Sequence, residues 1–364
     1  MGVTVGHVPD DLLPLQCRAR GSVRDAYDNG LSSAAGRRQV VMGDEYVIGV
    51  DSGGSHTRVV CVDLDGQMRG SSQAAGGSPT HNVNAKDHVQ SAIHDAIRRA
   101  GVEVGNAVGL VSGMAGFDGD RDLGWASEYV DVVGLACPRY IVNDAVVAHA
   151  GAFAGNSGII VVAGTGSMIF GITEAGEQIR NDRYFHYAGG ARHLSFDAMA
   201  RILIDEDTDA DADLVREVFQ FWGVSDKQGL RKIVRDHESA DRNDVKHSYG
   251  RMAQLITAAA ETSPLATAAC CQLAVATCVG IRLLAGHFES TAVSVALQGG
   301  LARSAAFAKS VETELAAAPG KRMNVVDPVL KPAAGAALLA LRRAGVDTNE
   351  RVVRRLAACD QLIG

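Results

Sequence analysis

The sequence predicts an α/β protein whose two similar domains face each other across a cleft. A chain of 364 residues is longer than one hydrophobic core usually organises. A plan of apolar run, Gly-rich turn, apolar run, small turn and third strand begins at Tyr46 and again at Gly158. The two copies start about 110 residues apart, which indicates a domain-scale duplication rather than a solenoid with a period of about 20–50 residues.

The first copy of this plan predicts a three-strand meander followed by a helix and two more strands. Residues 1–45 are mixed and polar, and we interpret them as an N-terminal extension. The first domain is expected over residues 46–145. Its expected elements are strands at 46–50, 58–62 and 67–72, a helix at 84–100, strands at 107–112 and 139–142, and a helix from about 143.

The second copy opens a domain expected over residues 146–342. It carries a helical insert at about 198–290, in which Pro264 begins a helix at its first turn. The expected helices are at 198–205, 210–222, 227–236 and, in two or more pieces, 244–286. Strands at 292–297 and 323–326 flank a helix at 304–318, and an Ala/Leu helix follows. A C-terminal helix at about 343–364 is expected to pack back on the first domain.

The composition is typical of a globular enzyme and excludes several classes of partner. The net charge is −7, and no basic block with interleaved aromatic residues occurs, which argues against nucleic acid as the main partner. We expect no membrane partner, because no uncharged apolar stretch of about 18 residues was identified. The N-terminus lacks the basic and apolar regions of a signal peptide.

The cysteines favour a reducing compartment. They are Cys17, Cys61, Cys137, Cys270, Cys271, Cys278 and Cys359. Their number is odd, and no metal-ligand spacing occurs among them. We predict reduced core residues and a cytoplasmic protein.

The first Gly-rich turn, DSGGSHT, has the composition of a phosphate site. Gly53 and Gly54 offer backbone N–H groups without Cβ obstruction, and such a nest binds phosphate oxygens. Ser55 and Thr57 add hydroxyl donors. Asp51 is suited to a hydrated Mg²⁺ that bridges phosphates. Ordinary hairpin geometry is the alternative for one turn alone.

Two further Gly-rich turns strengthen this interpretation. Gly164, Thr165, Gly166 and Ser167 form a second turn, AGTGS, at the equivalent place in the second copy. Gly299 and Gly300 lie between a strand and a helix in LQGGLARS, where a flat base or ribose could lie against backbone. A generic strand-to-helix turn is the alternative for this third motif.

The ordered set DSGGSHT, AGTGS and QGGLARS resembles the fold shared by actin, sugar kinases and heat-shock chaperone ATPases. Within it, residues 46–342 resemble the group containing N-acetylglucosamine kinase and the BadF/BadG/BcrA/BcrD ATPases. The resemblance implies two ribonuclease-H-like domains that close over ATP and Mg²⁺. It implies that Asp51 and Asp144 lie near the metal, that residues 164–167 contact the β- and γ-phosphates, and that Gly299 and Gly300 lie beside adenosine.

The same resemblance suggests the catalytic base of a kinase. Asp118 follows Ser112, Gly113 and Gly116, an arrangement similar to the Ser-Gly-Gly stretch that precedes the family's base. A solvated acidic loop is the alternative, and it suits the neighbouring aspartates better.

The acceptor residues are expected in three places. Thr80, His81 and Asn82 lie in GGSPTHNVN, which resembles the family's sugar-contact loop; a plain turn is the alternative. Asn143 and Asp144 end a strand that faces the cleft, although an Asp there also suits a helix N-cap.

The stretch GGARHLSFDAMARIL departs from the family pattern. Gly189 and Gly190 remain, and Asp197 falls where the family's substrate-binding Asp would be. The usual Trp is replaced by Ala191, so the acceptor pocket is expected to differ from one built for N-acetylglucosamine. Arg192 and His193 suit an anionic or polyhydroxylated substrate, or else a solvated surface.

These observations predict an ATP-dependent kinase acting on a sugar hydroxyl, with an amino sugar such as N-acetylglucosamine or a related sugar or cyclitol as the small-molecule acceptor. One alternative is a BadF-type ATPase that activates a partner reductase, although no convincing pair of iron–sulfur cysteines is evident. Another is a non-catalytic ATP-binding sensor. The oligomeric state is left open, and a homodimer is compatible with the sequence.

Overall fold

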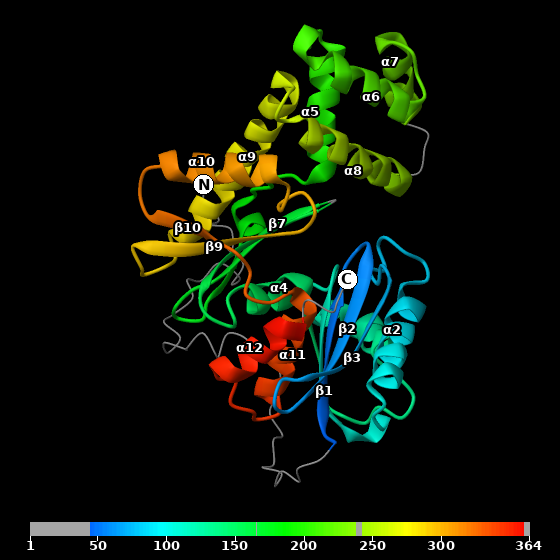
Figure 1. Ribbon diagram of the computed structural model, residues 1–364, viewed down its shortest axis with the longest axis vertical. Helices are drawn as coiled ribbons and strands as arrows, with labels where there is room; N and C mark the ends of the chain where they lie inside the picture. Colours follow the sequence, from blue (N-terminus) through cyan, green and yellow to red (C-terminus); the bar gives the residue numbers. More distant parts are fainter. Residues whose placement is uncertain (1–43, 165, 238–241, 360–364) are drawn as a thin grey trace, which may run out of the picture.

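The computed structural model describes residues 44–164, 166–237 and 242–359, and within them the chain forms two five-stranded sheets joined by helices (Figure 1). Nearly all of the N-terminal extension expected at 1–45 lies outside these residues, as does Thr165.

The first sheet has the strand order β3-β2-β1-β4-β5. Its strands are β1 (Tyr46–Ser52), β2 (His56–Asp63), β3 (Met68–Ala75), β4 (Ala107–Met114) and β5 (Arg139–Asn143). The first three strands form the expected antiparallel meander, and β1 pairs in parallel with β4 on its other edge. The central strand β1 is buried on both faces, which its nearly continuous apolar run predicts.

The second sheet repeats this plan with the order β10-β9-β6-β7-β8. Its strands are β6 (Gly158–Ala163), β7 (Ser167–Ile172), β8 (Gln178–Arg180), β9 (Ala292–Gln298) and β10 (Arg322–Val326). As in the first sheet, the opening strand β6 pairs antiparallel with its hairpin partner β7 and parallel with the crossover strand β9. The predicted α/β architecture of two similar halves is confirmed.

Most of the helices lie where their apolar periodicity predicts. They are α2 (Ala85–Ala100), α3 (Leu123–Tyr129), α4 (Asp144–Ala152), α5 (Ala191–Leu203), α6 (Ala212–Trp222), α7 (Lys227–Asp236), α8 (Arg242–Ala259), α9 (Pro264–Ala285), α10 (Ala305–Ala317), α11 (Pro332–Arg343) and α12 (Glu350–Cys359). Three features differ: α5 begins at Ala191 rather than at the expected residue 198, α12 begins at Glu350 rather than at about 343, and α3 was not predicted. Leu194, Ala198 and Ile202 are buried and lie four residues apart, a helical spacing that explains why the helix begins before residue 198.

The helix α11 corrects one domain assignment. It falls inside the second domain expected at 146–342, yet it packs on β1 and β4 of the first sheet and on α4. Residues 333–341 are all buried, so this helix is apolar on every face and needs partners on every side. The following helix α12 contacts α11 and β3, as expected for a C-terminal helix that returns to the first half. The domain boundary at residue 145 stays a prediction.

The helix α9 corrects a second expectation. With 22 residues it is long and apolar enough to cross a membrane by length and composition, a stretch that the sequence reading overlooked. In the structure 56% of its apolar window is buried. It contacts α5, α8, α10 and the strands β6 and β7, so it forms part of the core of the second half.

The helices α4 and α11 lie between the two sheets and approach each other through glycine. One apolar cluster joins them to Val47 and Val111 of the first sheet and to Ile160 and Phe170 of the second. A Cβ added at Gly335 of α11 would lie 2.3 Å from the carbonyl oxygen of Val147 in α4. This backbone contact leaves no room for a side chain.

We therefore expect Gly335→Ala to lower the free energy of unfolding by about 1–3 kcal/mol, the usual cost of overpacking. In an unconstrained helix the same change would be stabilising, so the sign tests the contact. Chemical denaturation measures the difference. Gly105→Ala is the matched control, because nothing lies within 4 Å of a Cβ at that position. Equal stability of Gly335→Ala and the unmodified protein would contradict the close packing.

Candidate functional site

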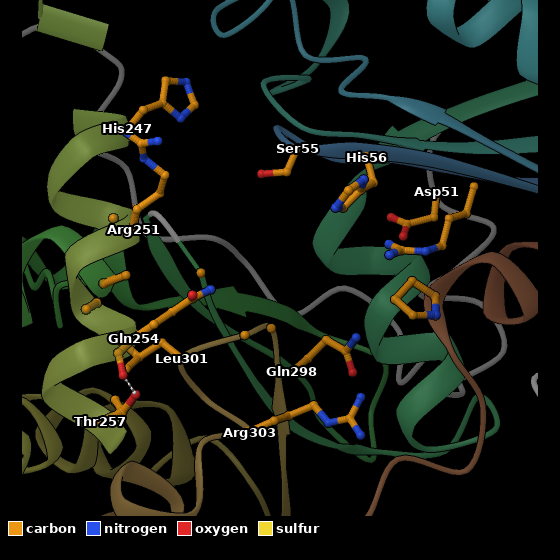
Figure 2. A pocket seen from close by; sticks show the side chains of 18 of the residues that line it. Asp51, Ser55, His56, His247, Arg251, Gln254, Thr257, Gln298, Leu301 and Arg303 are labelled. Atoms are coloured by element: carbon orange, nitrogen blue, oxygen red, sulfur yellow. Dashed lines mark hydrogen bonds between the residues drawn. The ribbon is translucent and has the colours of Figure 1, made fainter. Parts of the chain in front are cut away.

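The three Gly-rich turns line a single cavity of about 810 Å³ (Figure 2). Asp51, Ser55 and His56 come from the first turn, and Gly164 comes from the second. The third turn contributes Gln298, Gly299, Gly300, Leu301 and Arg303. Motifs that are far apart in the sequence therefore meet at one place, as their order predicted.

Alternate residues of β2, His56 and Arg58, face the cavity after the first turn. Asp51 and Arg58 are directly opposite in the β1–β2 register, and both line the cavity together with His56. Thr57 lies on the opposite side of the strand and is fully buried, and its role at the nucleotide stays a prediction. Arg58, which the sequence reading missed, takes the cavity-facing position instead.

One of the two backbone N–H groups predicted to bind phosphate at the first turn is already used within the turn. The N–H of Gly53 donates to the carbonyl oxygen of His56 at 2.9 Å and closes the turn. A ligand would therefore meet the tip, at Gly54 and Ser55. Ser55 points into the cavity in Figure 2.

The second turn is held by the third turn and by the start of α5. The carbonyl oxygen of Ala163 accepts from the N–H of Ala302 at 3.1 Å, and that of Gly164 accepts from Ala191 at 2.8 Å. A Cβ at Gly190 would lie 2.4 Å from the oxygen of Gly166. Gly189 and Gly190 were expected at the acceptor. In the structure Gly190 packs against the second turn, and a role of the two glycines at the acceptor stays a prediction.

Two polar details of these turns fit a phosphate ligand. The Ser167 hydroxyl is buried and has no hydrogen-bond partner among the described residues. Gly299 has a φ of +104°, and a Cβ there would lie 2.4 Å from the Ala163 oxygen, so only glycine fits. Gly300 has open space around it.

The carboxylates form an electrostatically linked group at the first sheet. Burial raises the pKa of Asp51 to about 7, with a further rise from the charge of Asp144 and an opposing effect of Arg58. Burial likewise raises the pKa of Asp144 to about 6, against backbone N–H donors at the start of α4. The charge of Asp144 thus opposes ionisation of Asp51, and that of Asp118 opposes ionisation of Asp144, so a bound cation would be favoured here.

This pair has a composition suited to magnesium. In the described part of the chain there is no group of three or more His, Cys, Asp or Glu side chains that could hold a metal. Mg²⁺ is commonly bound by one or two carboxylates together with substrate phosphates. Asp51 and Asp144 fit that mode, because Asp51 lines the cavity formed by the phosphate turns.

Asp118 lies exposed in the loop after β4 and is held from both halves of the molecule. Its N–H donates to Asp122 Oδ2 at 2.7 Å, and its Oδ1 accepts from Arg180 Nη1 at 3.0 Å. Arg180 belongs to β8 of the second sheet and also binds Asp182. Asn143 Nδ2 donates to the Phe117 oxygen at 2.9 Å and ties the loop to the start of α4.

The expected acceptor loop lies beside the first turn and opposite α8. Thr80 Oγ1 is 2.9 Å from His81 Nδ1, and the His81 ring lies edge-on to His247 with centroids 6.2 Å apart. A Cβ at Gly54 would lie 3.6 Å from His81 Nδ1. Asn82 Oδ1 accepts from the N–H of Asn84 at 3.0 Å, before α2.

Asp197 is not brought to this group. It lies within α5 and its Oδ2 pairs with Arg201 Nε at 2.7 Å. Within the described residues, Asp197 forms an ion pair with Arg201 alone, and Asp197 does not line the cavity. An intrahelical ion pair accounts for this side chain, and its role at the substrate stays a prediction.

The helix α8 lines the cavity, which was not predicted from the sequence. In Figure 2, His247, Arg251, Gln254 and Thr257 project from one helix across the cavity from Ser55 and His56. Their spacing places them along one helical stripe, while Tyr249, Met252 and Ile256 are buried on the other side. That polar stripe opposite an apolar one was a signal available in the sequence.

Comparison with known proteins supports the family resemblance over part of the chain. Residues 48–192 match the model of the BadF/BadG/BcrA/BcrD ATPase family, which confirms the predicted resemblance there. The chain is 30% identical over 149 residues to an N-acetylmuramic acid/N-acetylglucosamine kinase of Clostridium acetobutylicum. That match covers 40% of this chain and 48% of the relative, so the chain spans about half the length of the curated relative it matches.

Solved structures share the fold. A candidate N-acetylglucosamine kinase from Chromobacterium violaceum aligns with a TM-score of 0.63 and 24% identity, covering 81% of this chain and 99% of that chain. A ROK family glucokinase from Streptomyces griseus, in complex with glucose and AMPPNP, aligns with a TM-score of 0.55 and 18% identity, covering 81% and 98%. These likenesses confirm the predicted two-domain α/β fold.

The raised pKa of Asp51 predicts a pH-dependent stability. The folded protein binds the proton of Asp51 more tightly than the unfolded chain does. The stabilisation of the fold by this protonation is therefore complete below about pH 4. It is lost as the pH rises through about 7. We expect Asp51→Asn to raise the free energy of unfolding at pH 8 by about 1–4 kcal/mol, with the gain disappearing near pH 4.

Thermal unfolding of the ligand-free protein at both pH values measures this effect. Asp347→Asn is the control, because Asp347 is exposed and should show no pH-dependent gain. If Asp51→Asn gave no gain at pH 8, Asp51 would not be a buried, electrostatically disfavoured carboxylate.

Proposed function

We propose that this protein is an ATP-dependent kinase that phosphorylates a hydroxyl of a sugar. The observation that carries the proposal is the meeting of three Gly-rich turns at one cavity, with Asp51 at its wall and Asp144 and Asp118 linked to it in turn. The similarity to an N-acetylmuramic acid/N-acetylglucosamine kinase supports a sugar as acceptor. We propose a cytoplasmic location, where ATP is available and the described cysteines, which are free, remain reduced.

The cavity is suited to a nucleotide in size and in lining. Its volume of about 810 Å³ is within the range of about 300–1,000 Å³ typical of small-molecule sites. Ser55, Gly164 and Ser167 would hold phosphate oxygens, and the backbone at Gly299 and Gly300 would lie against adenosine. Arg58 and Arg303 line the same cavity and would balance the negative charge of the triphosphate.

Asp51 and Asp144 would hold Mg²⁺. Bound there, the ion would neutralise part of the negative charge of the triphosphate. The unpaired Ser167 hydroxyl and the disfavoured pair of carboxylates are the features of this chain that fit the ion and the phosphates together.

Asp118 would accept the proton of the acceptor hydroxyl while that oxygen attacks the γ-phosphorus and ADP departs. The loop that carries it is anchored by Asn143, so the base is fixed relative to the start of α4 and to Asp144. Its bond to Arg180 joins the first sheet to the second. We infer that Arg180 positions the carboxylate as the cleft closes over the substrates.

Thr80 and His81 are the best-placed groups for the acceptor. Their loop lies beside Gly54 at the tip of the first turn and presents a hydroxyl and an imidazole. We propose an amino sugar or a related sugar as the acceptor.

The structure gives no specific support to the reductase-activating alternative. Of the cysteines it describes as free, Cys61, Cys137, Cys270 and Cys278 are buried in apolar cores and Cys271 is exposed on α9. Burial raises the pKa of Cys61 and of Cys278 to about 12, which disfavours the thiolate that a cluster requires.

A panel of acceptors tests the proposed function. We expect ATP consumption by the purified protein to rise well above background with at least one amino sugar, sugar or cyclitol, and the phosphorylated product to be detected by mass spectrometry. The control is the same mixture without acceptor. If no acceptor raises turnover, the kinase assignment fails.

The base assignment predicts a separation of binding from chemistry. Asp118→Asn should lower kcat by about 10²–10⁴-fold, the usual contribution of a general base, while the affinity for ATP changes little. Steady-state kinetics and nucleotide titration measure the two effects. Asp120→Asn in the same loop is the matched control and should stay close to unmodified activity. Full activity of Asp118→Asn would show that another group takes the proton.

A further inference from the structure

We propose that the acceptor carries a carboxylate, and that Arg192 and Lys246 recognise it at the mouth of the cleft. The inference rests on the proposed kinase function and adds the chemical class of the substrate. The site is a basic cluster, which we define as His81, Arg192, His193, Lys246 and His247.

The basic cluster is assembled from three separate elements. His81 belongs to the loop before α2, Arg192 and His193 to the first turn of α5, and Lys246 and His247 to the first half of α8. The His81 and His247 rings meet edge-on, and Arg192 Nη2 donates to the Tyr187 hydroxyl at 3.3 Å. Tyr187 in turn contacts the His193 ring, with centroids 5.2 Å apart.

The electrostatics agree with this convergence. After burial, the charges of His247, Lys246 and Arg192 are what lower the pKa of His81. The pKa of His193 is lowered by burial and then by Arg192. Both imidazoles are therefore neutral at pH 7 and act as hydrogen-bonding groups, while Arg192 and Lys246 supply the positive charge.

Neither of these two cations is paired with a carboxylate in the described part of the chain. Among the residues that the structure describes, no carboxylate lies within ion-pair distance of Arg192 or Lys246. On the same helix as Arg192, by contrast, Arg201 is paired with both Asp197 and Glu206. Partly buried, uncompensated positive charge in a chain of net charge −7 points to an anionic ligand.

The position of the cluster favours the acceptor over the triphosphate. The cluster is built around His81, next to Thr80 and the tip of the first turn, where the acceptor is proposed to bind. The cavity that Gly299 and Gly300 line has cations of its own, Arg303 beside those glycines and Arg58 opposite Asp51 on the first sheet. His247 lies on the α8 wall across from Ser55 in Figure 2, so the cluster reaches the cavity through His247.

A carboxylate matches the donors that are present. The planar guanidinium of Arg192 can hold both oxygens of a carboxylate, and the ammonium of Lys246 adds a point charge. The neutral imidazoles and Thr80 would bind ring hydroxyls. A sugar that joins a carboxylate to a polyhydroxylated ring uses both sets of groups.

Matched acceptor pairs test the inference directly. N-acetylglucosamine and N-acetylmuramic acid share a ring and differ by a carboxylate-bearing ether, and glucose and glucuronate differ by a carboxylate. We expect kcat/KM to be higher for the acidic member of at least one pair, and the advantage to shrink as salt rises from 0.05 to about 0.5 M because screening weakens the attraction. A sugar phosphate in the panel distinguishes carboxylate from phosphate recognition.

Charge-removing variants locate the effect. Arg192→Gln and Lys246→Gln should each lower the acidic-to-neutral ratio of kcat/KM by about tenfold, the effect of losing one charge-assisted hydrogen bond, and Arg192→Lys should retain part of it. Arg216→Gln is the control, because Arg216 is an exposed residue of α6 paired with Asp213. Circular dichroism and ATP affinity, measured for each variant, verify that the fold is intact.

Three outcomes overturn the inference. One is an unchanged acidic-to-neutral ratio in both variants, and another is a KM for ATP that rises as much as that for the acidic acceptor. In either case the kinase function itself would stand. If no sugar is phosphorylated, the kinase proposal fails, and calorimetric titration of N-acetylmuramic acid against N-acetylglucosamine decides the rest. Equal or absent binding of the two would then refute the carboxylate site.

Discussion

The close packing of α4 against α11 joins the two sheets and sets the geometry of the site. Backbone meets backbone where Gly335 of α11 faces Val147 of α4, and both helices share an apolar cluster with strands of each sheet. The first residue of α4 is Asp144, so the contact that joins the halves also fixes the carboxylate whose charge acts on Asp51 at the cavity wall. A shift of α11 would move α4 and with it Asp144, because close-packed helices transmit strain to each other.

The phosphate side of the cavity depends on a second, smaller constraint. The end of β6 presents two carbonyl oxygens, those of Ala163 and Gly164, which accept from Ala302 and Ala191. These bonds fasten the third turn and the start of α5 to the second turn. These bonds hold the end of β6 to both neighbouring segments, and groups that are positioned in advance bind a ligand at a lower cost in ordering.

Local patterns in the sequence predicted the strands and the turns, because these depend on neighbours in the chain. The meander at 46–75 and its repeat from Gly158 follow from apolar runs broken by glycine. The burial of Thr57 was not predicted, because the turn motif does not define which face of the strand each residue takes, and neighbouring residues take opposite faces. The placement of α11 and the cavity-facing stripe of α8 could not be derived from turn motifs, since both depend on contacts between distant segments.

Charge is divided across the cleft, and this division limits what can bind. Asp51 and Asp144 make the first-sheet wall acidic, whereas Arg192 and Lys246 make the entrance beside α8 basic. A single anion would be attracted by one region and repelled by the other. A metal-bound polyphosphate satisfies the acidic wall through its cation, and an anionic acceptor satisfies the basic entrance. The two ligands would then be held at separate ends of the cleft, with the exposed Asp118 carried on a loop that Arg180 fastens across the two sheets.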